Sequence, residues 1–179
     1  MKIIQEALTS ELLEEVNGYF NDNIGEHAWR SGSVTWPMGI KQGVTHSPLI
    51  QNLPDELGDK VYKEIKASLP KSIIDKTIKT DCQICMWERL ASLSSHNDEK
   101  YTFAATIYLN KEWAIDNGGL FVWQELGQQT LKAFVPSFNS AVINDKDELH
   151  LVTPVSVFTH EPRYSIQLWG IGKETENAL

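Results

Sequence analysis

The stretch SSHNDEKYTFAATIYLNKEWAIDNGGLF, residues 94–121, carries three features that bear on the fold and on the chemistry. His96 and Asp98 stand two residues apart, and an extended chain points two such side chains to the same side. An apolar run over 102–109 follows, as is typical of a buried strand. Gly118 and Gly119 then indicate a turn. Two metal-ligating residue types therefore lie at the mouth of a predicted strand.

The second half of the chain repeats this pattern of short apolar runs separated by turn residues. Strands are predicted over 81–90, 102–109, 119–124, 131–135, 140–144, 149–153 and 163–169. Several short strands at near-regular spacing favour an all-β barrel or sandwich.

The first half has the periodicity of helices. Thr9 is a suitable N-cap, and apolar residues follow it at helical spacing as far as Phe20. A second helix is predicted to begin near Pro54 and to end at Pro70. The segment 73–78 could be a further helical turn or an early strand. The predicted class is therefore α+β, mainly β, with N-terminal helices packed against the outside of a β core.

The bulk properties fit one domain, residues 1–179, with a helical and loop part over 1–80 and the β core over 81–170. The net charge of −8 argues against a basic face for nucleic acid. The apolar runs are too short to span a bilayer, so no membrane is expected, and the N-terminus lacks the apolar core of a signal peptide. These features predict a cytoplasmic protein.

Cys82 and Cys85 are the only cysteines, in a Cys-x-x-Cys spacing that could indicate a redox or zinc site. Both interpretations are rejected. The segment reads as a strand, no helix N-terminus follows to lower a thiol pKa, and no second cysteine pair completes a zinc site. Two buried strand cysteines are expected.

Four polar residues sit at the edges of apolar strands: His96, Asp98, His150 and Arg163. Two imidazoles and one carboxylate on one face of a metal are the signature of non-haem Fe(II) oxygenases, and His150 is the best candidate for the distant ligand. If the strands of His150 and Arg163 are antiparallel neighbours, Arg163 lies close to the metal. Its planar fork of donors would suit the carboxylate of an oxo-acid co-substrate.

The segment from about Cys82 to Gly170 resembles the Fe(II)/2-oxoglutarate-dependent oxygenases, and it is most similar to their prolyl-hydroxylase branch. The motifs that carry the resemblance occur in the family's order: HND, TIYLNKEW, NGGLF, VPSFNSAVI, HLVTPV and RYSIQLW. The resemblance implies a double-stranded β-helix, or jelly roll, flanked by helices.

The resemblance also implies roles for individual residues. His96, Asp98 and His150 would be the iron ligands, and Arg163 with the Tyr108 hydroxyl would hold the distal carboxylate of 2-oxoglutarate. The implied cofactors are Fe(II), 2-oxoglutarate as co-substrate and O2, with ascorbate as a candidate reductant. Halogenating relatives replace the carboxylate ligand with a small residue, so Asp98 favours hydroxylation.

The substrate implied by the resemblance is a prolyl residue in a protein or peptide. Two alternatives stay open: hydroxylation of a free amino acid or another small metabolite, and a jelly-roll binding module without activity. The segment 26–52 is long for a loop, so it contains hidden strands or has a function such as a substrate lid. Trp169 is expected in the core, although the family has a Trp near its iron site. His27, His46 and His160 are expected to be bystanders.

Overall fold

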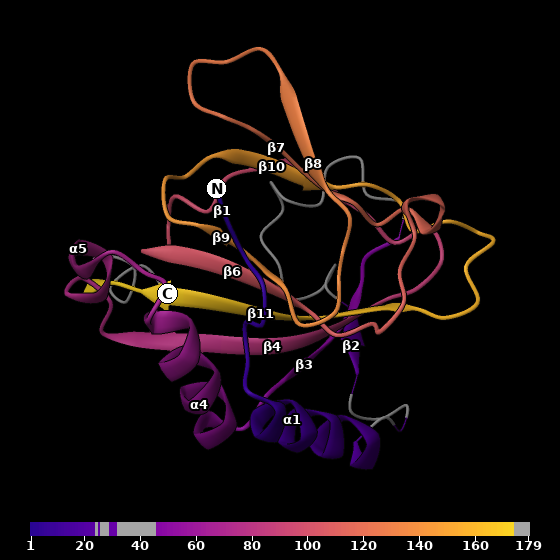
Figure 1. Ribbon diagram of the computed structural model, residues 1–179, viewed down its shortest axis with the longest axis horizontal. Coiled ribbons are helices and arrows are strands. Elements are labelled where there is room, and N and C mark those ends of the chain that lie inside the picture. Colours follow the sequence, from indigo (N-terminus) through magenta and orange to yellow (C-terminus); the bar gives the residue numbers. More distant parts are fainter. Residues whose placement is uncertain (24, 26–28, 32–45, 174–179) are drawn as a thin grey trace.

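The structure is a computed structural model that describes residues 1–23, 25, 29–31 and 46–173. Two sheets face each other in it, and the named strands pair antiparallel throughout (Figure 1). In order across the larger, seven-stranded sheet lie β1 (Lys2–Ile4), β9 (Ala141–Asn144), β6 (Phe103–Tyr108), β11 (Arg163–Ile171), β4 (Lys79–Trp87), β3 (Leu49–Asn52) and β2 (Arg30–Ser31). The smaller sheet has the order β5 (Leu93–His96), β10 (Leu149–Val152), β7 (Phe121–Gln124) and β8 (Leu131–Phe134). This is the predicted jelly roll.

All seven predicted strands are present, with ends shifted by a few residues. Strands β1, β2, β3 and β5 were not individually predicted, and β3 is a strand hidden in the long segment between the helices. The ambiguous segment 73–78 begins as a helical turn, α5 (Lys71–Ile74), and ends before β4. A short 3-10 helix, η2 (Ile115–Asn117), precedes β7.

Helices α1 (Ser10–Asp22) and α4 (Asp55–Lys66) lie on the outer side of the larger sheet, away from β7 and β10 (Figure 1). The predicted N-cap is confirmed, because the Thr9 hydroxyl accepts a hydrogen bond from the Leu12 N–H at 3.4 Å. Thr9 also donates its backbone N–H and its hydroxyl to the Glu64 carboxylate, at 2.6 and 2.7 Å. These bonds join the start of α1 to α4.

The larger sheet separates two apolar clusters, and alternation along β4 assigns each side chain to one of them. Cys82 and Ile84 pack under the helices, whereas Cys85 and Trp87 pack between the sheets. Both cysteines are free and buried, as expected. Burial raises the pKa of Cys85 to about 12, which makes it a poor nucleophile.

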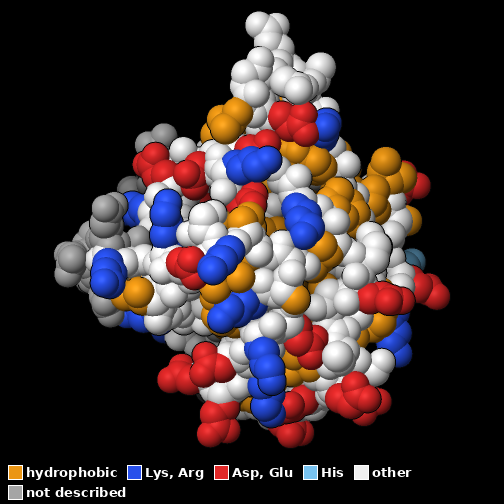
Figure 2. Space-filling model, turned by 60° about the vertical axis from the view of Figure 1, so that its left-hand side comes forward, with side chains coloured by type: hydrophobic (Ala, Val, Ile, Leu, Met, Phe, Trp, Pro, Cys, Tyr) orange, Lys and Arg blue, Asp and Glu red, His pale blue; other side chains and the backbone are white. Residues whose placement is uncertain are grey.

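The surface has mixed charge. On the face shown in Figure 2, Lys and Arg side chains are interspersed with Asp and Glu. Within the described residues, no helix has the length and apolar character needed to cross a membrane.

The helical layer is testable through Ile65, which is fully buried in α4 against the sheet. We predict that Ile65→Ala lowers the free energy of unfolding by about 2–5 kcal/mol, because it removes apolar contacts and leaves a cavity. Urea denaturation followed by fluorescence measures this change. Lys63→Ala, on the exposed side of the same helix, should change it by less than about 0.5 kcal/mol. Equal effects of the two variants would show that α4 does not carry a core face.

Candidate metal centre

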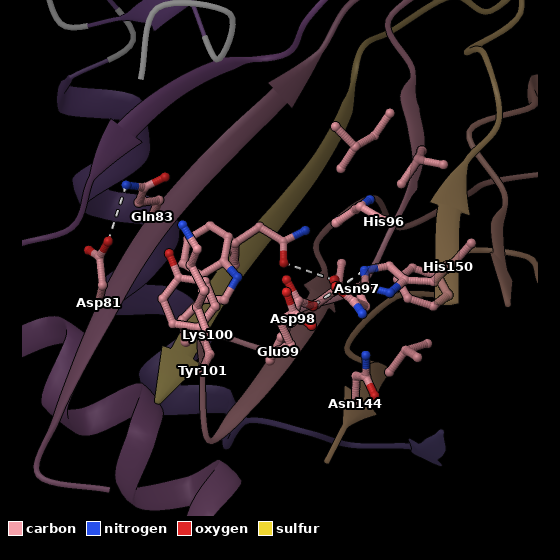
Figure 3. A pocket seen from close by; sticks show the side chains of 18 of the residues that line it. Asp81, Gln83, His96, Asn97, Asp98, Glu99, Lys100, Tyr101, Asn144 and His150 are labelled. Atoms are coloured by element: carbon pink, nitrogen blue, oxygen red, sulfur yellow. Dashed lines mark hydrogen bonds and ion pairs between the residues drawn. The ribbon is translucent and has the colours of Figure 1, made fainter. Parts of the chain in front are cut away.

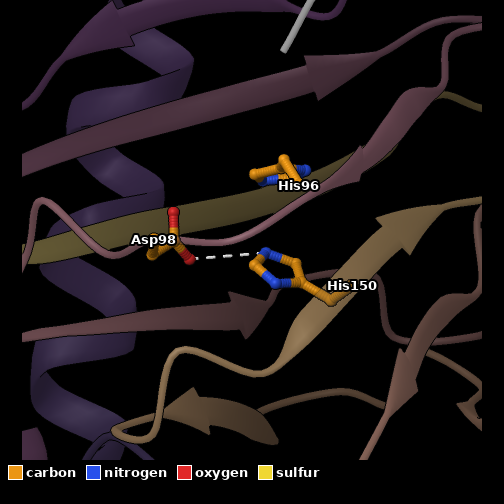
Figure 4. A group of neighbouring side chains, drawn as sticks. All are labelled: His96, Asp98 and His150. Carbon is orange, nitrogen blue, oxygen red and sulfur yellow. Dashed lines mark ion pairs between the residues drawn. The ribbon is translucent and has the colours of Figure 1, made fainter. Parts of the chain in front are cut away.

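The three predicted ligands come together at the inner face of the smaller sheet (Figure 4). His96 ends β5 and lies directly opposite His150 on β10, while Asp98 follows two residues after His96. One ligand atom from each residue lies within 4.8 Å of the others, and His150 Nε2 is 3.4 Å from Asp98 Oδ2. This arrangement of two imidazoles and one carboxylate suits a divalent transition metal.

Both imidazoles are oriented by the same local contact. His96 Nδ1 lies 2.8 Å from the Ser94 carbonyl, and His150 Nδ1 lies 3.0 Å from the Glu148 carbonyl. Because a carbonyl oxygen only accepts, each Nδ1 carries the proton and donates it. Each Nε2 lone pair is then available to a metal, as in many metal sites. The ring of Phe121 stacks on His150, with centroids 5.1 Å apart, and restrains it further.

The three side chains are poorly solvated, and this burial changes their pKa values. Burial lowers the pKa of His150 to about 4, and burial together with His150 lowers the pKa of His96. Both imidazoles are therefore neutral near pH 7. Burial raises the pKa of Asp98, while His96 and a hydrogen bond from Trp169 act in the opposite direction. A metal ion would restore to these groups the interactions that burial removes.

The triad lines one part of a pocket of about 730 Å³ (Figure 3). The inner face of the larger sheet forms another part, with Asp81 and Gln83 from β4, Thr106 from β6, and Gln167 and Trp169 from β11. The pocket therefore lies between the two sheets, with the metal ligands on one and a polar wall on the other.

Arg163 and Tyr108 are fully buried. Arg163 Nη1 donates to the Gly119 carbonyl at 2.6 Å, and its guanidinium carbon lies 4.4 Å from the Trp87 ring centroid and 5.4 Å from that of Tyr108. Arg163 Nε and Nη2 and the Tyr108 hydroxyl have no hydrogen-bond partner, and no ion pair with Arg163 occurs within the described parts of the chain. Three buried donors thus lack an acceptor, which is costly unless an anion binds.

The expectation that the strands of His150 and Arg163 are antiparallel neighbours is wrong. Strand β10 belongs to the smaller sheet and β11 to the larger one, where β4 and β6 occupy both of its edges. The segment 153–162 therefore crosses between sheets and is not a hairpin loop. Arg163 instead reaches Gly119, just before β7 of the smaller sheet.

The paired glycines make a close approach to other parts of the chain. Gly118 and Gly119 have φ values of 65° and 60°, which L side chains rarely adopt. A Cβ on Gly118 would lie 2.2 Å from the Pro154 carbonyl oxygen, and one on Gly119 would lie 3.1 Å from Arg163 Cδ. The backbone at Gly119 therefore packs directly against the Arg163 side chain.

Trp169 is only partly buried and lines the pocket, so its expected place in the core is wrong. Its side chain lowers the pKa of the Asp98 carboxyl, next to the metal position. Among the expected bystanders, His46 and His160 are exposed and lie outside the triad. His27 and most of the expected lid, residues 26–28 and 32–45, lie outside the described residues.

The sequence analysis missed the polar wall formed by Asp81 and Gln83. The signal that could have found it is the alternation along β4, since both residues share their parity with Cys85 and Trp87 and so face the same way.

Comparison with known proteins places this geometry in a family. The 2OG-Fe(II) oxygenase superfamily matches residues 82–170. No curated protein sequence matches the chain. Among solved structures, the chain is similar to a prolyl-4-hydroxylase from Pseudomonas putida, at 15% identity over 96% of this chain and 92% of that one, with a TM-score of 0.74.

Two further structures are similar. A prolyl hydroxylase from Trichoplax adhaerens, in complex with a peptide fragment of the hypoxia inducible factor oxygen degradation domain, has 17% identity over 99% of this chain and 86% of that one, with a TM-score of 0.71. An oxidoreductase of the 2OG-Fe(II) oxygenase family from Burkholderia pseudomallei has 15% identity over 96% of this chain and 87% of that one, with a TM-score of 0.67.

The chain belongs to the 2OG-Fe(II) oxygenase superfamily, and its fold is that of the prolyl 4-hydroxylase-like branch. It is an Fe(II)- and 2-oxoglutarate-dependent dioxygenase, with O2 as the oxidant and a His-x-Asp…His metal-binding triad.

The triad predicts a specific loss in a variant. Mn(II) should raise the melting temperature of the metal-free wild-type protein, because it binds the native state alone. We predict that His150→Ala abolishes this metal-dependent increment, whatever its effect on the metal-free protein. Differential scanning fluorimetry with and without Mn(II) measures it. His160→Ala, which changes an exposed imidazole, should keep the full increment. A retained increment in His150→Ala would remove His150 from the metal site.

Proposed function

We propose that this dioxygenase hydroxylates an unactivated C–H bond, with a prolyl residue of a protein or peptide as substrate. In the overall reaction, O2 gives one oxygen atom to the substrate C–H bond and one to 2-oxoglutarate, which leaves as succinate and CO2. Similarity to two prolyl hydroxylase structures, one of them holding a peptide, supports the substrate class.

The observation that carries this proposal is the buried donor set of Arg163 and Tyr108. A fully buried guanidinium with two unused nitrogens and a phenol beside it is complementary to a carboxylate. Burial raises the pKa of Tyr108, so its hydroxyl stays protonated and can donate. We assign the distal carboxylate of 2-oxoglutarate to this pair.

The chain's own residues hold and orient the reactants. In this proposal His96, Asp98 and His150 bind Fe(II), which when bound activates O2 for oxidation of a C–H bond. The Nδ1 contacts of the two imidazoles fix the direction in which Nε2 points. Helices α1 and α4 cover the sheet whose inner face lines the pocket, so residues 1–179 would act as one domain.

The proposal is tested first by adding Fe(II) and then 2-oxoglutarate to metal-free protein without oxygen. A weak visible charge-transfer band that needs both additions is expected, because the keto acid must chelate the bound iron. With oxygen restored, proline-containing peptides should gain one oxygen atom by mass spectrometry while succinate forms. Absence of the band and of any stabilisation by either addition would leave the jelly-roll binding module as the better account.

Tyr108→Phe separates binding of 2-oxoglutarate from folding. The variant removes a buried hydroxyl that has no partner, so the ligand-free protein should be as stable as wild type or more stable by about 1 kcal/mol. We predict that its affinity for 2-oxoglutarate falls about tenfold, because one hydrogen bond to a carboxylate is lost.

Titration of the Fe(II)-loaded protein, followed by the charge-transfer band, measures the affinity of Tyr108→Phe for 2-oxoglutarate. Tyr19→Phe is the matched control, since that hydroxyl makes its hydrogen bonds at the outer side of the fold. Unchanged affinity in Tyr108→Phe would show that the hydroxyl does not touch the co-substrate.

A further inference from the structure

We propose that the pocket contains a cation subsite, formed by Asp81, Gln83, Tyr101 and Trp169, which holds a positively charged nitrogen of the substrate near the metal centre. The inference rests on the proposed function, because it names the chemistry by which this oxygenase would select its substrate. The shared feature of the predicted substrates is an ammonium or guanidinium group close to the C–H bond that is oxidised.

The subsite adjoins the metal centre through a short chain of contacts. Asp81 on β4 lies directly opposite Trp169 on β11, and the Trp169 side chain lies close enough to Asp98 to lower the pKa of that carboxyl. The Tyr101 ring centroid is 5.8 Å from that of Trp169. In the view of Figure 3, Asp81 and Gln83 lie at one side of the pocket and the metal triad at the other, with Tyr101 between them.

The two polar side chains of the subsite offer acceptors without matching donors. Asp81 is half-buried, its carboxylate accepts a long hydrogen bond from Gln83 Nε2 at 3.4 Å, and the nearby Cys82 backbone N–H lowers the pKa of this carboxyl. Among the residues that the structure describes, no basic side chain forms an ion pair with Asp81. The Gln83 side chain is only 9% exposed, and its Oε1 has no hydrogen-bond partner.

These acceptors and the adjacent aromatic rings match a cation. A carboxylate and an amide oxygen can both accept from one ammonium group, and the faces of Tyr101 and Trp169 would attract its charge. Burial raises the pKa of Asp81, whereas Arg30 and Lys79 lower it and Asp55 raises it at longer range. A cation in the subsite would offset the solvation that the ionised carboxylate has lost.

Two basic residues also line the pocket, and one of them distinguishes between two sources of the cation. Arg30 and Lys100 are exposed, and Arg30 Nη2 donates to Asn52 Oδ1 at 3.0 Å. The nitrogen could be the α-ammonium of a free amino acid, whose carboxylate Arg30 would then contact. It could instead belong to a basic side chain beside the target residue of a peptide, and Arg30 would then have no such role.

The test compares pairs of probes that differ in charge. The first pair is L-proline and N-acetyl-L-proline, and the second is the end-blocked dipeptides Lys-Pro and Gln-Pro. Calorimetry without oxygen measures their binding to metal-free protein and to protein loaded with Fe(II) and 2-oxoglutarate. We expect the probe with a positively charged nitrogen in at least one pair, L-proline or Lys-Pro, to bind about tenfold more tightly than its counterpart without one.

Variants tie this preference to the subsite. Asp81→Asn should remove the tenfold preference, whereas Asp55→Asn, which removes a nearby exposed charge outside this pocket, should keep it. Arg30→Gln should weaken binding of L-proline if the amino acid is the source and leave the Lys-Pro dipeptide unaffected. Melting curves check that each variant is folded.

The outcomes are distinct. If no probe with a positively charged nitrogen binds more tightly than its counterpart without one, or if Asp81→Asn keeps the preference, the subsite does not exist. A different experiment tests the proposed function. If that function is wrong, the charge-transfer band is absent when wild-type protein receives Fe(II) and 2-oxoglutarate. Amine selectivity in metal-free protein does not depend on that band, so each idea can fail alone.

Discussion

The alternation of side chains across the seven-stranded sheet is the constraint on which the rest of the structure depends. Along β11, Ile166 and Leu168 pack under the helices, while Arg163, Gln167 and Trp169 face the space between the sheets. Because the period is two, a register slip of one residue would exchange the apolar layer with the functional one. Helices α1 and α4 bury the outer face and so allow the inner face to carry polar groups.

Those inner side chains of the larger sheet differ in burial. Trp87, Tyr108 and Arg163 are fully buried, whereas Asp81 and Trp169 are half-buried and line the pocket. An uncompensated guanidinium at full burial costs stability in the ligand-free protein. The same desolvation strengthens its attraction to a carboxylate, because water no longer competes for the donors. The unpaired donors of Arg163 and Tyr108 and the acceptors of Asp81 and Gln83 thus favour ligand groups of opposite charge in the two regions.

Local patterns in the sequence carried most of the fold and the metal triad. Short apolar runs between turn residues identified the seven predicted strands, and the spacing of His96 and Asp98 with His150 before an apolar run identified the candidate ligands. Length does not separate the missed strands from these, since β7 to β10 also have four residues each; β2 and β5 contain no apolar run, and β1 and β3 contain only two adjacent apolar residues each. The two-residue alternation along a strand shows which face of the sheet a side chain occupies, but it does not show which strand lies alongside. For this reason β10 and β11 were wrongly expected to be neighbours. Trp169 was misplaced because an aromatic residue at an inward position reads equally well as core or as pocket wall.

The division of the site between the sheets has an energetic consequence. His96 and His150 belong to the smaller sheet, whereas Tyr108 and Arg163 belong to the larger one. A metal ion alone would join the end of β5, the following loop and β10. A 2-oxoglutarate molecule that chelates this metal and reaches Arg163 would connect the two sheets directly. Since a ligand stabilises the state that binds it, the co-substrate would stabilise the packing of the sheets beyond what the metal does. The metal would therefore bind first and connect parts of the smaller sheet. The keto acid would bind second and connect that sheet to the larger one.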